Sequence, residues 1–283
     1  WRRLGELAVG DRVALSRVLP EPAQARRWDD HHLVLLGHLI GDGSYLPRQP
    51  LRYTTASQEN SDAVRAAAEA FGCTVNRHAG RGRWHQLVIS GNGNRWHPAG
   101  VQRWLRDLGI FGQRSHEKRL PESVFALGND QIALLLRHLW ATDGCISVRR
   151  PGAQGAARVY FSTCSEVLAR DVAALLMRLG IVARLRSVHH GATRPVWTVD
   201  VSGAAQQRRF LERVGTFGPR EEPGRQLLAV LDAASGTGTN VDTLPREVFA
   251  QVIQLAPLRN IAQRPLQALL PADIGAQHKI SAG

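Results

Sequence analysis

Cysteine, methionine and lysine are scarce in this chain of 283 residues. The three cysteines, Cys73, Cys145 and Cys164, form no CxxC pair, which argues against a disulfide framework or a cysteine zinc site. The eleven histidines show no HExxH or zinc-finger spacing, so we do not expect a protein-bound zinc ion. Reduced thiols and the lack of an export signal at the start of the sequence fit a cytoplasmic protein.

Long apolar runs are also missing. No stretch approaches the roughly 18 residues that a membrane span needs, so we expect no membrane segment. Acidic residues are too few to balance the basic ones: 36 Lys and Arg against 24 Asp and Glu give a net charge of +12. All but two of the basic residues are arginine. The excess of positive charge predicts a polyanionic partner, with nucleic acid favoured over an anionic membrane.

The chain contains an internal duplication. The stretch LLGHLIGDG at residues 35–43 recurs as LRHLWATDG at 136–144, which places Asp143 101 positions after Asp42. Four further blocks recur in the same order at similar offsets, among them YTTASQEN from Tyr53 and YFSTCSEV from Tyr160. A repeat of this length indicates two copies of one structural unit.

Each copy has the pattern helix, two strands, helix, two strands, helix. This pattern predicts an α+β fold of two pseudo-symmetric αββαββα repeats with mainly antiparallel sheets. We assign repeat one to residues 31–117 and repeat two to 118–235. Residues 236–283 are expected to form a helical extension, either a helix-turn-helix-like DNA reader or a plain packing domain.

The motif helix ends on an aspartate, although the carbonyls at a helix C-terminus repel negative charge. Gly37 and Gly41 leave one stripe of this helix bare, so we expect it to pack closely against the second motif helix. Asp42 and Asp143 would then lie side by side, with the carbonyls of Gly41 and Thr142 beside them. Two close carboxylates need a cation, and hard oxygen ligands suit Mg²⁺. Asp-Gly is also a common turn, but its recurrence at equivalent points favours a metal site.

The two motifs and the repeat around them, over residues 33–218, resemble the double-motif LAGLIDADG homing endonucleases. The resemblance implies a saddle of two sheets that grips a long double-stranded DNA site, and a monomer with an internal pseudo-two-fold axis. It implies that Asp42 and Asp143 bind Mg²⁺, for which Mn²⁺ substitutes, and that the preceding carbonyls assist. His138 stands where the family usually has a small residue and Ala141 where it often has Asp, so a looser helix crossing is expected there.

Other stretches resemble inteins, the family's protein-splicing hosts. HEKRLPESVF at residues 116–125 resembles the block before the second motif in intein-borne members, which implies that Lys118 acts near the scissile phosphate. Arg220 is its counterpart in the second repeat. Residues 1–30 resemble the remnant of an N-terminal splicing segment, and VDTLPREVFAQV in the tail resembles inteins of bacterial replicative helicases. A solvated surface lysine is the alternative interpretation of Lys118.

Side chains on the expected sheet faces are candidate DNA contacts, since arginine binds guanine edges or phosphates. They are Arg48, Arg52, Thr55, Arg81, Arg83, Arg149, Arg150, Arg158, Ser162, Arg184, Arg186 and Arg194.

The sequence therefore predicts an intein-derived, Mg²⁺-dependent, site-specific DNA endonuclease. Its main alternative is a DNA- or RNA-binding module of the same fold that has lost cleavage, such as a maturase or a regulator. A third alternative is that the segment serves only as the middle of a splicing protein.

Overall fold

The structure is a computed structural model that describes residues 3–8, 11, 13, 16, 19–148, 157–189, 195–233 and 254. The chain divides into two compact units, one formed by Trp1–Leu15 with Asp242–Gly283 and the other by Ser16–Val241. The first unit has a short 3-10 helix, Leu4–Glu6. The expected helical extension at residues 236–283 lies outside the described residues, apart from residue 254. In the part of the chain that the structure describes, no helix has the length and apolar character needed to cross a membrane.

The second unit holds both repeats, and each repeat has the predicted order of elements. The first consists of α1 Asp30–Asp42, β1 Gly43–Ser44, β2 Leu51–Thr55, α2 Gln58–Ala70, β3 Thr74–Ala79, β4 His85–Ser90 and α3 Gly100–Asp107. The second consists of α4 Asn129–Asp143, β5 Gly144–Ser147, β6 Arg158–Thr163, α5 Glu166–Arg178, β7 Arg184–Val188, β8 Val196–Asp200 and α6 Ala204–Arg213. Two 3-10 helices, Glu122–Ala126 and Gly218–Arg220, and the helix α7, Glu221–Ala233, complete the described elements of this unit.

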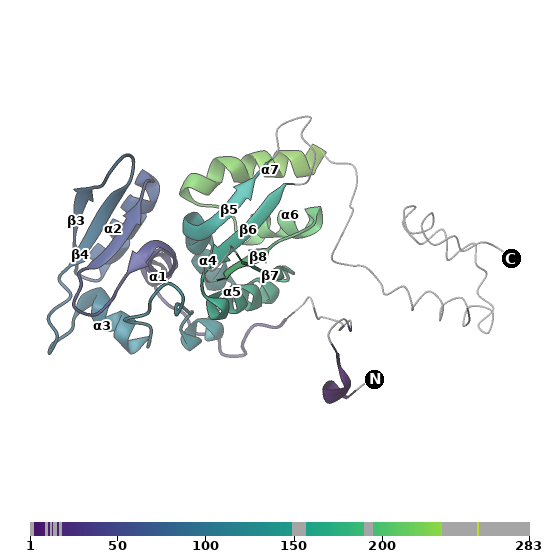
Figure 1. The fold of residues 1–283 in the computed structure, drawn as a ribbon, viewed down its shortest axis with the longest axis horizontal. Coiled ribbons are helices and arrows are strands. Elements are labelled where there is room, and N and C mark those ends of the chain that lie inside the picture. Colours follow the sequence, from purple (N-terminus) through teal and green to yellow (C-terminus); the bar gives the residue numbers. More distant parts are fainter. Residues whose placement is uncertain are drawn as a thin grey trace. The chain divides into compact units, whose positions relative to one another are not determined.

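The two sheets have the same topology. Their strand orders are β1-β2-β4-β3 and β5-β6-β8-β7, and every pairing is antiparallel. Figure 1 shows β3 and β4 of the first repeat and β5 to β8 of the second on either side of α1 and α4. The predicted α+β class with two αββαββα repeats is confirmed.

Alternation along the strands separates a buried sheet face from an open one. In β2, Leu51, Tyr53 and Thr55 are buried while Arg52 and Thr54 are partly exposed. The strand β6 alternates in the same way. The buried faces of both sheets and the apolar sides of α1 and α4 form one continuous core. Among the described residues, the side chains on the opposite face of each sheet are the more exposed ones.

Serine residues begin the middle helix of both repeats. The hydroxyl of Ser57 accepts a hydrogen bond from the backbone N–H of Asn60, and that of Ser165 accepts one from Leu168. Such N-caps satisfy backbone donors that the first helical turn leaves unpaired. Their equivalence shows that the duplication extends to the ends of the helices.

The helix α7 has no counterpart in the first repeat and was not predicted. It follows the second repeat directly and packs against α6. Pro223 lies in its first turn, where a missing N–H costs no helical hydrogen bond. Buried Leu227 ties the helix to the core.

Candidate active site

The two motif aspartates are the last residues of α1 and α4, as the sequence predicts. Each is followed by a glycine in extended conformation, so the chain leaves the helix and enters a strand at once. A Cβ atom on Gly43 would lie 2.4 Å from the carbonyl oxygen of Leu39, and one on Gly144 would lie 2.3 Å from the Trp140 ring. Glycine is therefore needed at both exits, and this tight turn holds each carboxylate at the end of its helix.

The two helices are in close contact over the residues just before these aspartates. A Cβ atom added to Gly41 would lie 1.9 Å from the hydroxyl oxygen of Thr142. One added to Gly37 would lie 2.8 Å from the backbone nitrogen of Leu139 and 2.9 Å from the Cβ of His138. Real Cβ atoms do not come so near, so both glycines are required by the crossing.

The expectation of a looser crossing at His138 is therefore wrong. His138 corresponds to Gly37 in the alignment of the two motifs, and the structure places these two residues against each other. The absence of a side chain on one helix makes room for the large side chain on the other. The crossing stays tight because the large residue His138 is present in only one repeat, while the other repeat keeps Gly37 at the corresponding position.

Lys118 caps the end of α1. Its ammonium nitrogen donates to the carbonyl oxygens of Gly41 at 2.7 Å, Gly43 at 2.9 Å and Leu39 at 3.3 Å. The side chain is buried, with 6% exposed. Its charge offsets the negative end of the helix, which the terminal Asp42 makes still more negative.

Arg220 has the equivalent position in the second repeat. Its Nη2 donates to the carbonyl oxygen of Thr142 at 3.0 Å. Lys118 and Arg220 lie 102 positions apart, close to the offset between the two aspartates. Each half of the site therefore combines a carboxylate, a preceding carbonyl and a basic group that binds that carbonyl.

Both aspartates line one cavity of about 310 Å³. Lys118 and residues at the end of β6 also line it. The full lining is Ile40, Gly41, Asp42, Ser115, Lys118, Asp143, Ser162, Thr163, Cys164 and Val196. Ser115 and Cys164 were not predicted as site residues from the sequence.

The environment of the cavity shifts the pKa values of the two aspartates and of Lys118. Although both carboxylates are accessible to solvent, the surrounding protein removes part of their hydration. The pKa of Asp42 is raised to about 6 by burial and, to a smaller extent, by the charge of Asp143, while Lys118 and Arg220 act to lower it. Burial also raises the pKa of Asp143, against the same two basic groups. Burial lowers the pKa of Lys118 to about 8, although both carboxylates act to raise it.

The donor set at this site fits a hard divalent cation. Two carboxylates and two backbone carbonyls offer only oxygen atoms, which Mg²⁺ prefers. Burial and, after it, the charge of Asp143 raise the pKa of Asp42, so the ionised pair carries a cost that Lys118 and Arg220 only partly offset. A bound cation would relieve this repulsion.

Most predicted DNA contacts for which the structure gives positions lie on open surface. Arg52 and Ser162 are on the open sheet faces, and Arg158 and Arg186 are exposed on β6 and β7. Arg48, Arg81 and Arg83 are exposed in turns, and Arg184 begins β7. Arg149, Arg150 and Arg194 lie outside the described residues.

Thr55 differs from this group. Only 8% of it is exposed, and its hydroxyl accepts a hydrogen bond from the backbone N–H of Ser57. Since strand residues alternate between faces, the neighbouring Thr54 has the open position instead. Thr55 thus stabilises the turn that leads into α2 and lies away from the open face.

Two buried histidines at the helix crossing were also missed. His38 Nε2 lies 3.1 Å from His138 Nδ1, and His38 Nδ1 lies 3.0 Å from the Tyr53 hydroxyl. In addition, the side-chain amide of Asn60 donates to the carbonyl oxygen of Ala141 at 3.1 Å. The bonds from His38 to His138 and from Asn60 to Ala141 join the two repeats near the carboxylates. The only sequence signal was the histidine at a position where a small residue was expected.

Comparison with known proteins agrees with this arrangement. The family model described as the LAGLIDADG-like domain matches residues 130–215, which cover most of the second repeat. The replicative DNA helicase DnaB of Rhodothermus marinus is 41% identical over 97% of this chain. DnaB of Synechocystis sp. is 35% identical over 95% of it. The chain spans only 30% and 31% of the length of these two relatives.

Among solved structures, I-DmoI in complex with DNA and Mn matches 66% of this chain and 96% of its own, at 14% identity and a TM-score of 0.46. The sequence matches and the repeated architecture lead to one assignment. The second repeat is a LAGLIDADG-like domain, in a chain related over nearly its whole length to a segment of DnaB helicases.

Proposed function

We propose that this chain is a site-specific endonuclease that cleaves both strands of DNA with Mg²⁺ held by Asp42 and Asp143. Mn²⁺ is expected to substitute for Mg²⁺. The observation that carries the proposal is the meeting of the two motif carboxylates in one cavity, together with a buried lysine, in a protein of net charge +12. Two like-charged carboxylates that share one cavity repel each other, so their pairing without a bound cation would be unfavourable.

The residues of the cavity suit phosphodiester hydrolysis. A divalent cation between the carboxylates would supply positive charge for a phosphate oxygen and for an attacking water. The Lys118 ammonium lines the same cavity, so its charge is available to a phosphate that enters it. Because its pKa is about 8, Lys118 can release or accept a proton near neutral pH. Arg220 is always charged and serves to neutralise phosphate charge, not as a base.

The open sheet faces support DNA as the substrate. Arg52 and Ser162 have their positions there, and Arg158 and Arg186 add exposed positive charge on the second sheet. Two similar sheets side by side offer an extended basic surface for a long duplex. Sequence-specific contacts come from the arginines that reach base edges, and the others bind phosphates.

We also propose that the chain is the nuclease part of an intein in a replicative helicase. The support is its relation to a segment of DnaB from two bacteria over nearly the full length of this chain. The expected target is then the insertion site in a helicase gene that lacks the intein.

The test is cleavage of a plasmid that carries such an insertion site. We expect linear product with Mg²⁺ and none with a chelator. Asp42→Asn and Asp143→Asn should abolish cleavage and keep binding, whereas Asp107→Asn, which changes an exposed carboxylate on α3, should leave cleavage intact. Full cleavage by both active-site variants would refute the metal assignment.

Binding without cleavage under every metal condition would instead support the alternative, a binding module that has lost nuclease activity. Assaying ligation of the flanking sequences in the full-length protein tests the intein context separately. A splicing product without DNA cleavage would keep the host assignment and overturn the nuclease.

A further inference from the structure

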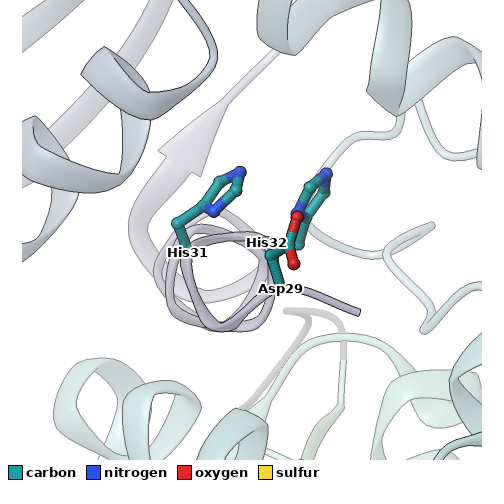
Figure 2. A group of neighbouring side chains, drawn as sticks. All are labelled: Asp29, His31 and His32. Carbon is teal, nitrogen blue, oxygen red and sulfur yellow. The ribbon is translucent and has the colours of Figure 1, made fainter. Parts of the chain in front are cut away.

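A second cluster of metal-ligating side chains lies at the opposite end of α1 from Asp42. Ligand atoms of Asp29, His31 and His32 all lie within 4.8 Å of one another. Figure 2 shows the carboxylate and the two imidazoles grouped at the start of the helix. With a rise of about 1.5 Å per residue, the 13-residue helix separates this cluster from Asp42 by about 18 Å.

Asp29 does not do what an aspartate at this position usually does. It is the N-cap residue of α1, yet its side chain makes no capping hydrogen bond. The N-cap residues of α2 and α5 do form this bond. The carboxylate of Asp29 thus does not make this stabilising contact and remains available beside the histidines.

His32 carries an unused nitrogen. Its Nδ1 is buried and has no hydrogen-bond partner. Buried polar atoms are nearly always paired, so an unpaired one calls for a missing partner. An imidazole nitrogen is the commonest protein ligand of a divalent metal ion.

Aromatic side chains fix both rings in place. The His32 ring centroid lies 4.6 Å from that of Phe71 and 5.2 Å from that of Trp104. The His31 ring lies 5.1 Å from Phe71 and 4.2 Å from His32. Rings held in this way lose little freedom when they bind a ligand.

We propose that Asp29, His31 and His32 bind one Zn²⁺ ion or a similar borderline dication, with water completing its coordination. Two imidazole nitrogens and one carboxylate oxygen suit such an ion better than Mg²⁺, which prefers oxygen ligands alone. The donor set thus differs in kind from the one at Asp42 and Asp143. The bound ion would join the residue before α1 to its first turn.

The local charge permits a cation there. A helix N-terminus carries partial positive charge, which opposes a metal ion. The carboxylates of Asp29 and Asp30 offset it, and the nearby guanidinium of Arg27 is 2.9 Å from the carboxylate of Asp130. The balance predicts moderate affinity.

The test measures Zn²⁺ binding by calorimetry and Co²⁺ binding by visible absorption. It uses the metal-free full chain with Asp42→Asn and Asp143→Asn, so that the other carboxylate pair does not contribute. We expect one ion per chain and a visible Co²⁺ band of a site with nitrogen ligands. Removal of one ligand should weaken binding at least about tenfold, the lower end of what loss of an outer-shell partner costs.

Three further substitutions in this background decide the question. Asp29→Asn keeps the shape and the capping ability of the residue, so its effect is not a folding defect. His32→Gln removes the ring, and His78→Gln changes an exposed histidine on β3 as the matched control. Weaker binding in the first two with none lost in the third would support the site. Equal binding in all three, or no binding in the parent chain, would overturn it.

Discussion

The ammonium nitrogen of Lys118 lies 2.7 Å from the carbonyl oxygen of Gly41 and 2.9 Å from that of Gly43, so one side chain spans the exit of α1. Arg220 makes one such bond to the end of α4. The two basic groups are therefore equivalent in position and unequal in the number of bonds they form. This inequality leads to the first prediction.

Replacing Lys118 by Met should lower the free energy of unfolding by about 1–3 kcal/mol, because buried carbonyl groups lose their donor. Arg220→Met should cost less, since it frees one carbonyl oxygen. Urea unfolding of both variants measures the difference. An Arg220 variant that is the less stable of the two would contradict the capping role of Lys118.

The helix crossing yields a prediction about paired substitutions. Gly41→Ala would place a Cβ atom 1.9 Å from the Thr142 hydroxyl and should destabilise the protein by about 1–3 kcal/mol. Thr142→Gly removes the opposing side chain, so the double variant should recover part of the loss. A double-mutant cycle on unfolding free energies measures the coupling, and strict additivity would argue against the contact.

Gly37→Ala is the matched comparison. Its Cβ would meet the backbone nitrogen of Leu139 at 2.8 Å, which no side-chain change can move. Removing the His138 side chain should therefore fail to rescue it. Rescue would mean that the helices separate more easily than the structure indicates.

The buried histidines predict a stability loss in acid. Burial lowers the pKa of His38 to about 3, with a further contribution from His138, and burial lowers that of His138 to about 4, with Arg137 adding to the shift. An unfolded histidine has a pKa of about 6.5, so below that pH the unfolded state binds more protons. Stability is therefore full above pH 6.5 and falls as the pH drops toward 4.

The slope should be roughly 1.4 kcal/mol per pH unit for each of the two histidines. Denaturant unfolding between pH 7 and pH 5 measures it. His138→Gln should remove the contribution of one histidine from this slope. His78 is exposed on β3, so His78→Gln should leave the slope unchanged. The same slope in all three proteins would show that other groups control the acid response.

DNA binding should depend on salt through the open sheet faces. Arg52→Gln and Arg158→Gln should each lower the slope of log affinity against log salt by about 1 if the side chain binds a phosphate. Arg103→Gln on α3, where Arg103 pairs with Asp107 at 2.9 Å, is the control. Fluorescence anisotropy at several salt concentrations gives the slopes. Unchanged slopes for both sheet variants would place the DNA elsewhere.

The helix ends and site residues that occur in both repeats could be predicted from the sequence. The ends of α1 and α4 at Asp42 and Asp143 could be predicted because each motif supports the other. Lys118 was identified from the resemblance of its surrounding block to inteins and Arg220 as its counterpart in the second repeat, although neither argument reveals their hydrogen bonds. The helix α7 has no counterpart in the first repeat, so this approach could not find it.

Side-chain direction was harder to predict. Thr55 was expected on the DNA face, yet it shares the buried face with Tyr53 because the two are two positions apart in β2. The pairing of His38 with His138 joins positions that do not correspond in the two motifs. A comparison of equivalent positions therefore could not reveal it. The cluster at Asp29, His31 and His32 matches no familiar metal spacing and emerges only when the helix is formed.

The division of small and large residues at the crossing has a consequence for how the halves can be exchanged. Gly37 and Gly41 belong to α1, and the larger residues His138 and Thr142 that face them belong to α4. Two copies of α4 would bring four bulky side chains to one seam, and two copies of α1 would leave that seam hollow. Each motif helix therefore packs better against the other motif helix than against a copy of itself, as in an obligate heterodimer. A hybrid protein built by joining one half to a foreign partner must keep this complementarity between small and large residues if the two halves are to pack.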